Sequence, residues 1–484
     1  MKSQKKIEIT TSINIVLDIP DSFLKESQYI IENLFFPFKE DFLFIGKDED
    51  CENNSYKIIY IYEDRFNIND AQKASDKLYI VLKKSTLDYF SCYQEYNLEE
   101  IIYINDIPCL FPLHSDNSNN KISNVFPFDL FASSFYFLSC WQEYSISERD
   151  RKGRIPLKAT LQNKLGIIRI PIVNEYLRIF EKYIKTLWGI TLEYKKMPGN
   201  TNNFVALSHD ICRIDLPLER YLKYLFGNRK VIEKNFSNFV ALGKNIWCKK
   251  NIYAKIKNLE LEYGASSTYY FLSRYPRKYK NFSRYLIKLL DGTAFEIGHH
   301  ISDNSIFDGS LNEDNYFFKE VVRDCYGERV HKLRFVVDKL FSQLEKSKYY
   351  YDNSLLFAED VGYRTGFSYP HYIFDHVRKK PFKVLAIPLN VMDATLVDRK
   401  FLLLNDNLAE KELISFMENA LQYGGVFSVL FHCGFFWLNP DKRFKIFESL
   451  LQFLAEKEVK VGTCRDVFLW YRKMCNPSRP SIKF

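Results

Sequence analysis

The chain has 484 residues, of which 46% are hydrophobic and 26% are charged, the balance of a folded globular protein rather than a disordered one. This length exceeds what a single hydrophobic core usually serves, so we predict two domains. The net charge of +8 is small for the length and the basic residues are scattered, which argues against a nucleic-acid-binding protein. No stretch reaches the ~18 to 20 uninterrupted apolar residues of a membrane span, so we predict no transmembrane segment.

The cysteines and the first residues of the chain give information about the cellular compartment of the protein. The ten cysteines are irregularly spaced and form no C-x-x-C pair, which favours reduced thiols over a disulfide framework or a zinc ribbon. Residues 1–6 are basic, but no apolar segment of the kind found in signal peptides follows them. We therefore predict a cytoplasmic protein.

The first part of the chain is typical of an α/β domain without a catalytic cluster. Strands are predicted over residues 7–17, 58–62 and 78–82, and helices over residues 127–146 and 177–188. Residues 198–203, rich in Asn with one Pro and one Gly, give the clearest linker signal in the chain. We predict an α/β accessory domain over residues 1–198 and a second domain over residues 199–484.

In the second domain, strand-like and helical patterns alternate. Strands are predicted over residues 204–207, 267–272, 295–297, 383–389 and 426–431, and helices over residues 282–290, 328–344 and 411–423. Such alternation indicates βα units and a parallel sheet. Parallel β/α folds place their chemistry at the carboxyl ends of the strands. The apolar run 204–207 leads directly into Ser208, His209, Asp210 and Cys212, so these side chains are candidates for a site.

Five segments, in chain order, resemble the motifs of polysaccharide deacetylases of carbohydrate esterase family 4: residues 208–212, 296–305, 362–366, 389–393 and 430–432. Residues 329–334 resemble an R-x-H-x-L-R element of a bacterial branch that has an extra N-terminal α/β domain. Residues 127–136, 142–144 and 150–154 resemble that extra domain. Each motif is weak by itself, but ordered matches over more than 200 residues are specific together.

The resemblance implies a distorted (β/α)7-type barrel, the polysaccharide deacetylase fold, preceded by the accessory domain. It also implies roles for four catalytic residues. Asp210 would be the general base, Arg364 would hold its carboxylate, His432 would be the general acid, and Asp393 would orient His432.

The resemblance further implies a divalent metal, with zinc the expected ion. His300 aligns with the first histidine ligand of the family. Cys212 stands where the family has an aspartate ligand, and Asn304 stands where it has the second histidine. A thiolate is a good zinc ligand and an amide a poor one, so His331 or His299 could compensate for Asn304.

Three functions are compatible with these residues. The first is metal-dependent de-N-acetylation of a sugar in a glycan or glycan precursor, in which Asp210 takes a proton from water and His432 protonates the leaving amine. The second is glycan binding or scaffolding by a barrel that has lost its metal, which Cys212 and Asn304 favour. The third is hydrolysis of a different carbon–nitrogen bond. We favour the first, because Asp210, Arg364, Asp393 and His432 are all present.

Overall fold

The computed structural model describes residues 12–45, 56–114, 123–212, 252–272, 280–290, 293–313, 322, 325–437 and 440–475. The basic residues 1–6 and the start of the strand predicted over 7–17 lie outside this part. The chain divides into two compact units. Unit 1 consists of Met1–Asp150, Ile155–Lys196 and Tyr363–Phe382, and unit 2 of Arg151–Arg154, Met197–Gly362 and Lys383–Phe484.

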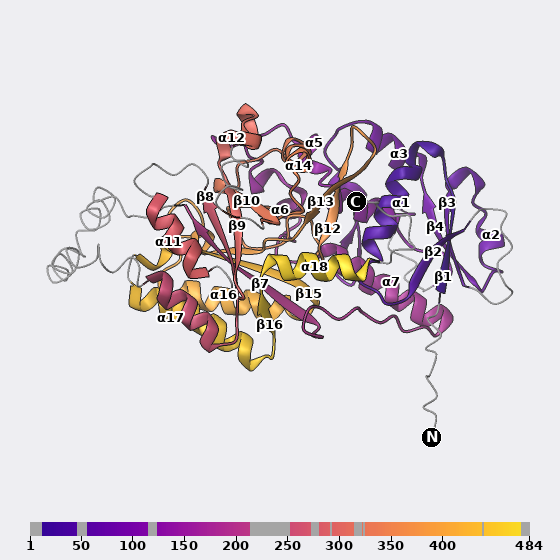
Figure 1. The fold of residues 1–484 in the computed structure, drawn as a ribbon. Helices are drawn as coiled ribbons and strands as arrows, with labels where there is room; N and C mark the ends of the chain where they lie inside the picture. The colour runs from indigo at the N-terminus through magenta and orange to yellow at the C-terminus, as the bar shows by residue number, and fades with distance from the viewer. Residues whose placement is uncertain are drawn as a thin grey trace, which may run out of the picture. The chain divides into compact units, whose positions relative to one another are not determined.

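Unit 1 is built on a parallel sheet of four strands in the order β2-β1-β3-β4 (Figure 1). The strands are β1 (Ser12–Asp18), β2 (Asp41–Ile45), β3 (Lys57–Tyr62) and β4 (Lys77–Leu82). The register aligns Ile58 of β3 with Ile15 of β1 and with Leu78 of β4, and all three side chains are fully buried. The strands predicted over 58–62 and 78–82 are therefore confirmed.

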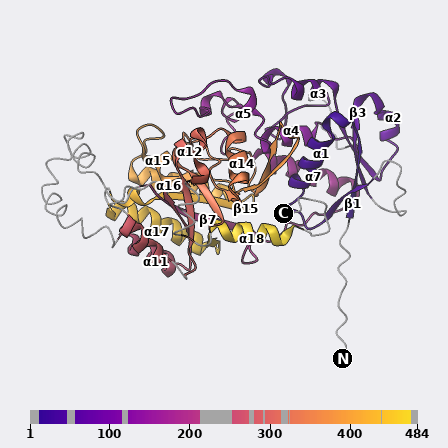
Figure 2. The same ribbon diagram turned by 45° about the horizontal axis from the view of Figure 1, so that its top comes forward.

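Helices, of which α1, α2, α3, α4, α5 and α7 are labelled in Figure 2, and a small antiparallel hairpin complete unit 1. The helices are α1 (Leu24–Leu34), α2 (Ile68–Ala71), α3 (Lys84–Ser91), α4 (Leu130–Leu138), α5 (Gln142–Ser145), α6 (Leu161–Lys164) and α7 (Ile172–Trp188), and the hairpin pairs β5 (Ile102–Ile104) with β6 (Ile107–Cys109). The helix predicted over 127–146 is thus two helices. Cys140 separates them with a left-handed backbone (φ 56°), which ends helical hydrogen bonding.

A segment from late in the chain belongs to unit 1, which a single boundary at residue 198 does not anticipate. Its strand β12 (His371–Asp375) packs against α1 and α4. The Tyr29 hydroxyl donates to the Tyr372 carbonyl at 2.7 Å, and the Tyr372 amide donates to Asn33 Oδ1 at 3.2 Å. These buried bonds join segments more than 300 residues apart, so no local pattern could have revealed them.

Unit 2 contains a parallel sheet that runs β13-β11-β10-β9-β8-β7-β15-β14, with β16 beside the first half of β7. The strands are β7 (Asn203–Ile211), β8 (Thr268–Leu272), β9 (Glu296–Ile301), β10 (Gly327–Val330), β11 (Tyr351–Asp352), β13 (Lys380–Ala386), β14 (Val391–Met392), β15 (Gly425–His432) and β16 (Lys460–Gly462). Together with the helices between them, they form the distorted β/α barrel that we predicted, left open between the two ends of this order in the described residues.

Helices alternate with these strands along the chain. They are α11 (Lys280–Leu290), α12 (Asp303–Asp308), α14 (Val337–Lys346), α15 (Asp393–Val397), α16 (Asp406–Ala420), α17 (Pro440–Glu456) and α18 (Cys464–Met474). Helices α16 and α17 pack together and lie beside the sheet in both ribbon views (Figures 1 and 2). Phe204, Val205, Ala206 and Leu207 of β7 are at most 1% exposed, as expected for a strand covered on both faces.

The helix predicted over residues 328–344 is wrong in its first half. Residues 327–330 form β10, which pairs with β9 on one side and β11 on the other, and α14 begins only at Val337. Glu328 and Arg329 are both fully buried on this strand. Two charged residues in sequence do not suggest an inner strand, because their burial depends on partners from distant segments.

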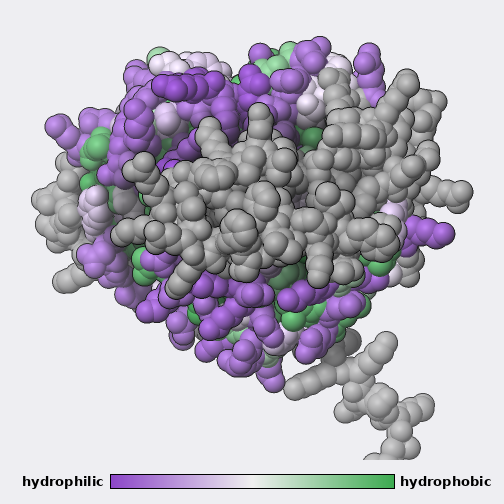
Figure 3. All heavy atoms as spheres, turned by 90° about the vertical axis from the view of Figure 1, so that its left-hand side faces the viewer, coloured by the Kyte–Doolittle hydropathy of each residue, from purple (hydrophilic) through white to green (hydrophobic). Residues whose placement is uncertain are grey.

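The described helices include none that is long and apolar enough to span a membrane. On the face drawn in Figure 3, the described surface is mostly hydrophilic, with small separate hydrophobic patches.

Candidate active site

The strand register of unit 2 gathers the predicted side chains. β7 pairs with β15 so that Asp210 is aligned with His432. β10 pairs with β9 so that Arg329 is aligned with His300. All four residues lie at or near the carboxyl ends of parallel strands, where this class of fold places its chemistry.

Alternation along β7 decides which side chains enter the site. Ser208 and Asp210 share one face because successive side chains of a strand point to opposite sides. His209 points to the other face, where its buried Nε2 lies 2.8 Å from Glu260 Oε1 and its ring 4.9 Å from that of Tyr269. His209 therefore contributes to packing behind the sheet and not to the site.

Arg329 holds the Asp210 carboxylate. Its Nη1 donates to Asp210 Oδ1 at 2.8 Å, its Nη2 donates to Ser208 Oγ at 2.8 Å, and its Nε donates to the Asn353 carbonyl at 2.9 Å. The guanidinium also lies 4.4 Å from the centroid of the Tyr270 ring. Arg329 is 0% exposed, so these contacts fix both the cation and the carboxylate that it pairs with.

The surroundings of Asp210 determine its ionisation. Burial alone would raise the pKa of this carboxyl, but His300, Arg329 and His432 lower the pKa to about 2. His300 Nε2 lies 3.6 Å and His432 Nε2 lies 3.9 Å from Asp210 Oδ2. Asp210 is thus an ionised, buried carboxylate at neutral pH, as a general base must be.

His432 is paired with Asp393. Asp393 is the first residue of α15, its Oδ1 lies 2.6 Å from His432 Nδ1, and its Oδ2 accepts from the His432 amide at 3.0 Å. Burial lowers the pKa of His432, but Asp393 and Cys212 raise it well above its ordinary value. With Nδ1 bonded to Asp393, a protonated His432 presents Nε2–H on the side of Asp210.

Cys212, His300 and His331 form a group of possible metal ligands. Their Sγ and ring nitrogen atoms all lie within 4.8 Å of one another. Cys212 Sγ is 3.3 Å from His300 Nε2, while His300 Nδ1 is 2.9 Å from the Arg329 carbonyl oxygen. Because Nδ1 donates to this carbonyl, Nε2 is free of its proton when His300 is neutral and can act as a ligand.

Cys212 also belongs to a second group, with Asp210 and His432, whose ligand atoms lie within the same 4.8 Å limit. Burial raises the pKa of this thiol, but His300, His331 and His432 lower it well below its ordinary value. Cys212 therefore belongs to both groups, and its surroundings favour the thiolate form.

The remaining predicted ligand, Asn304, is used differently. It is exposed on the first turn of α12, and its Oδ1 accepts from Arg334 Nη1 at 3.4 Å. His331, in contrast, lies with its Nδ1 3.4 Å from Asp303 Oδ1 and supplies the second imidazole of the cluster. The interpretation of Asn304 as a ligand has no support in these contacts.

The role predicted for Arg364 requires a correction, because Arg329 is the arginine that holds Asp210. Arg364 lies in unit 1, where its Nε donates to Glu143 Oε1 at 2.9 Å and its carbonyl accepts from Gln162 Nε2 at 2.9 Å. Residues 329–334 resemble a deacetylase motif, but the resemblance gives no role for Arg329. The signal in the sequence is the position of Arg329 in this motif, two residues before His331.

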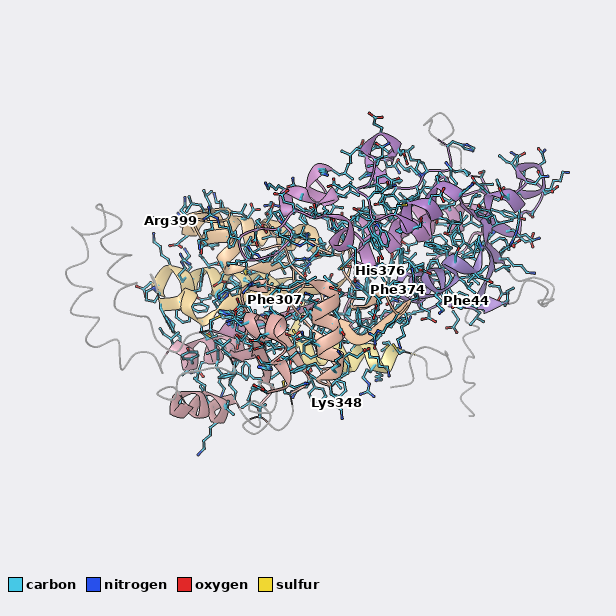
Figure 4. All side chains as sticks on the ribbon, turned by 90° about the horizontal axis from the view of Figure 1, so that it is seen from above. Phe44, Phe307, Lys348, Phe374, His376 and Arg399 are labelled. Atoms are coloured by element: carbon cyan, nitrogen blue, oxygen red, sulfur yellow. The ribbon has the colours of Figure 1, made fainter. Side chains whose placement is uncertain are left out.

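Three other histidines are packing residues. Burial lowers the pKa of His299 to about 3 and that of both His371 and His376 to about 4, so each is neutral in the folded protein. His299 Nδ1 is bonded to the Tyr349 hydroxyl. The His376 ring lies edge-on to the Phe374 ring, with centroids 5.4 Å apart (Figure 4).

Fold and site together define a β/α barrel whose strand ends gather an aspartate held by a buried arginine, a histidine paired with a second aspartate, and a thiol–histidine donor set. Residues 15–189 match a family of unknown function, DUF7033. No curated protein matches the chain.

Several solved structures are similar to the chain. A probable polysaccharide deacetylase from Pseudomonas aeruginosa PAO1 is 12% identical, with 57% of this chain and 93% of that chain covered and a TM-score of 0.40. PuuE allantoinase is 11% identical, with 57% and 92% covered and a TM-score of 0.38. A CE4 family pseudoenzyme from Bacillus anthracis is 10% identical, with 55% and 65% covered and a TM-score of 0.31.

Proposed function

We propose that the chain is a metal-dependent hydrolase that removes the acetyl group from an N-acetylated sugar in a glycan or glycan precursor. The observation that carries this proposal is the position of Asp210. Its carboxylate is held by a buried arginine and lies between two histidines, one in each ligand group. The five ordered motifs of the sequence support the same reaction class.

The residues fit a zinc ion. Thiolate sulfur and imidazole nitrogen are zinc's preferred protein ligands, and catalytic sites use three of them and keep one position open. Cys212, His300 and His331 would hold the ion, and the Arg329 carbonyl and Asp303 would orient the two rings. A bound ion of this kind lowers the pKa of water and polarises a carbonyl.

The protons would be handled by Asp210 and His432. Asp210, kept ionised by Arg329, would accept the proton of the attacking water. His432, kept protonated by Asp393, would donate Nε2–H to the nitrogen of the leaving amine. His432 Nε2 lies 3.9 Å from Asp210 Oδ2, so the base and the acid would act on the same small reacting group.

A second candidate is a metal-free barrel that binds a glycan or scaffolds an assembly. It is favoured by Cys212 at the position of the family's aspartate ligand, and by Asn304 at that of its second histidine. The retained Asp210, His432 and Asp393 weigh against it, because a site without a reaction has no need for a base, an acid and its orienting carboxylate.

The test is metal content together with acetate release from N-acetylated glycans. We expect about one zinc per chain in the purified protein, lost in His300→Ala and retained in Asp210→Asn. Asp210→Asn should lower acetate release by about 10²- to 10⁴-fold. His114→Ala, at an exposed position in unit 1, is the matched control and should change neither quantity. A chain that binds no metal after zinc is supplied would sink this mechanism and favour the binding protein.

A further inference from the structure

The turn that follows β10 is held in an unusual backbone conformation. Lys332 and Leu333 both have left-handed backbones, with φ of 62° and 49°. Such angles are costly for residues with a Cβ, and consecutive ones are rare in chains of L-amino acids. Leu333 is only 4% exposed, so its burial anchors the turn, while the Lys332 side chain is 45% exposed. Strain of this kind is retained where the rest of the structure requires that conformation, and functional sites are common examples.

This turn places cations directly beside the candidate active site. His331, which belongs to the ligand group, precedes Lys332 in the chain. The side chains of His331, Lys332 and Arg334 all contact Asp303. Asp303 Oδ1 lies 3.4 Å from His331 Nδ1 and 3.3 Å from Lys332 Nζ, and Oδ2 lies 3.4 Å from Arg334 Nη1. A single carboxylate therefore faces two permanent cations and a histidine.

Asp303 does not use the full hydrogen-bonding capacity of Lys332 and Arg334. Tight charge-assisted hydrogen bonds have lengths of about 2.7–2.9 Å, and the Lys332 and Arg334 contacts are longer than this. Arg154 Nη1 also donates to the Lys332 carbonyl at 3.3 Å, which helps to fix the turn. At this turn, the two positive charges of Lys332 and Arg334 face the single negative charge of Asp303.

Arg334 is fixed on a rigid base. Its Nε donates to the Lys152 carbonyl at 2.7 Å, and its guanidinium lies 4.5 Å from the centroid of the Phe307 ring. Phe307 belongs to α12 and is 41% exposed (Figure 4). A guanidinium held by its Nε and by a ring keeps a planar edge for a ligand, and that edge matches a carboxylate or a phosphate.

We propose that Lys332 and Arg334 form an anion-binding rim of the active site, and that the N-acetylated sugar substrate carries a carboxylate or a phosphate group. The reaction at this sugar rests on the function proposed above, whereas the recognition of the anion does not. The rim adjoins the ligand group, because His331 of that group precedes Lys332 in the chain and both side chains contact Asp303.

The experiment compares three probes on the full chain: N-acetylglucosamine, N-acetylglucosamine 1-phosphate and N-acetylglucosaminuronic acid. Dissociation constants are measured by calorimetry and kcat/KM by acetate release, each at low and high salt. We expect an anionic probe to be preferred over the neutral one, and the better of the two to identify the anion as phosphate or carboxylate. High salt should weaken this preference.

Variants of Lys332 and Arg334 then test whether these residues cause the preference for anionic probes. Lys332→Gln and Arg334→Gln should each lower the ratio of anionic to neutral binding by about threefold to tenfold, and Lys332→Arg should retain it. Lys411→Gln, at an exposed position on α16, is the matched control and should leave the ratio unchanged.

Two results would contradict the proposal of an anion-binding rim: equal binding of the three probes, or an anionic preference that Lys332→Gln and Arg334→Gln leave intact.

A different result would separate this proposal from the proposed hydrolase function. If an anionic probe binds through Lys332 but no probe releases acetate, the rim stands and the hydrolase proposal fails.

Discussion

Each unit of this protein buries an arginine–carboxylate pair, and the two pairs have different surroundings. In unit 1, Arg364 and Glu143 are 4% and 6% exposed in their side chains, and amide and backbone groups bond to them: Gln162 donates to the Arg364 carbonyl, and Arg149 to the Glu143 carbonyl at 3.3 Å. In unit 2, the Asp210 carboxylate that Arg329 holds also faces His300 and His432.

This difference teaches that an ion pair does not reveal its role by residue type. Additional hydrogen bonds must offset the free-energy cost of removing a buried ion pair from water, whether or not the pair takes part in chemistry. What distinguishes Asp210 is that its second oxygen is turned to groups that can exchange protons or bind a metal. Arg364, whose segment resembles a motif of the deacetylases, pairs with Glu143, whereas Arg329 pairs with Asp210.

The largest expected effect comes from exchanging the two arginines for glutamine. Arg329→Gln and Arg364→Gln should each destabilise the protein by about 3–5 kcal/mol, because each leaves a buried carboxylate without its cation. Only Arg329→Gln should also lower acetate release, by about 10²-fold or more, in protein shown to be folded. Chemical denaturation and acetate release measure the two effects. A folded Arg364→Gln variant that loses activity as completely would remove the distinction between the two pairs.

A smaller effect is expected from Asp393→Asn. The Asp393 carboxylate is the largest of the influences that raise the pKa of His432, so its loss should lower that pKa. His432 would then lose its proton at a lower pH, and the alkaline limb of the activity profile should move to lower pH. The rate at the optimum should fall by about 10- to 100-fold. An alkaline limb that does not move would show that His432 is not the acid.

The smallest effect concerns Asp129, a buried carboxyl of unit 1 that pairs with no cation in the part of the chain that the structure describes. It caps α4 by accepting from the Ala132 amide at 2.9 Å, and it accepts from the Tyr60 hydroxyl at 2.8 Å. Burial raises the pKa of Asp129 to about 7, opposite to the shift of Asp210.

The folded state therefore binds more protons than the unfolded state between about pH 4 and pH 7. The stability that Asp129 contributes is complete below this window and is lost as the pH rises through it, with a slope of at most about 1.4 kcal/mol per pH unit. Asp129→Asn should flatten that slope in denaturation measured at several pH values. The same slope in both proteins would assign it to another group.

The sequence by itself determined the alternation of strands and helices in unit 2, because burial on both faces of a strand leaves a continuous apolar run. It also determined the positions of Asp210, His300, Asp393 and His432, since each of these residues lies at or just after the end of a predicted strand. The parallel sheet of unit 1 was visible in the same way through β3 and β4.

Only the tertiary structure decided which arginine holds Asp210, that residues 327–330 form a strand, and that residues 363–382 belong to unit 1. It also decided that His331 rather than Asn304 joins Cys212 and His300. The physical reason is common to these cases. A buried charge or an inner strand is stable only with partners from distant segments, and a sequence pattern records the local environment of a residue rather than those partners.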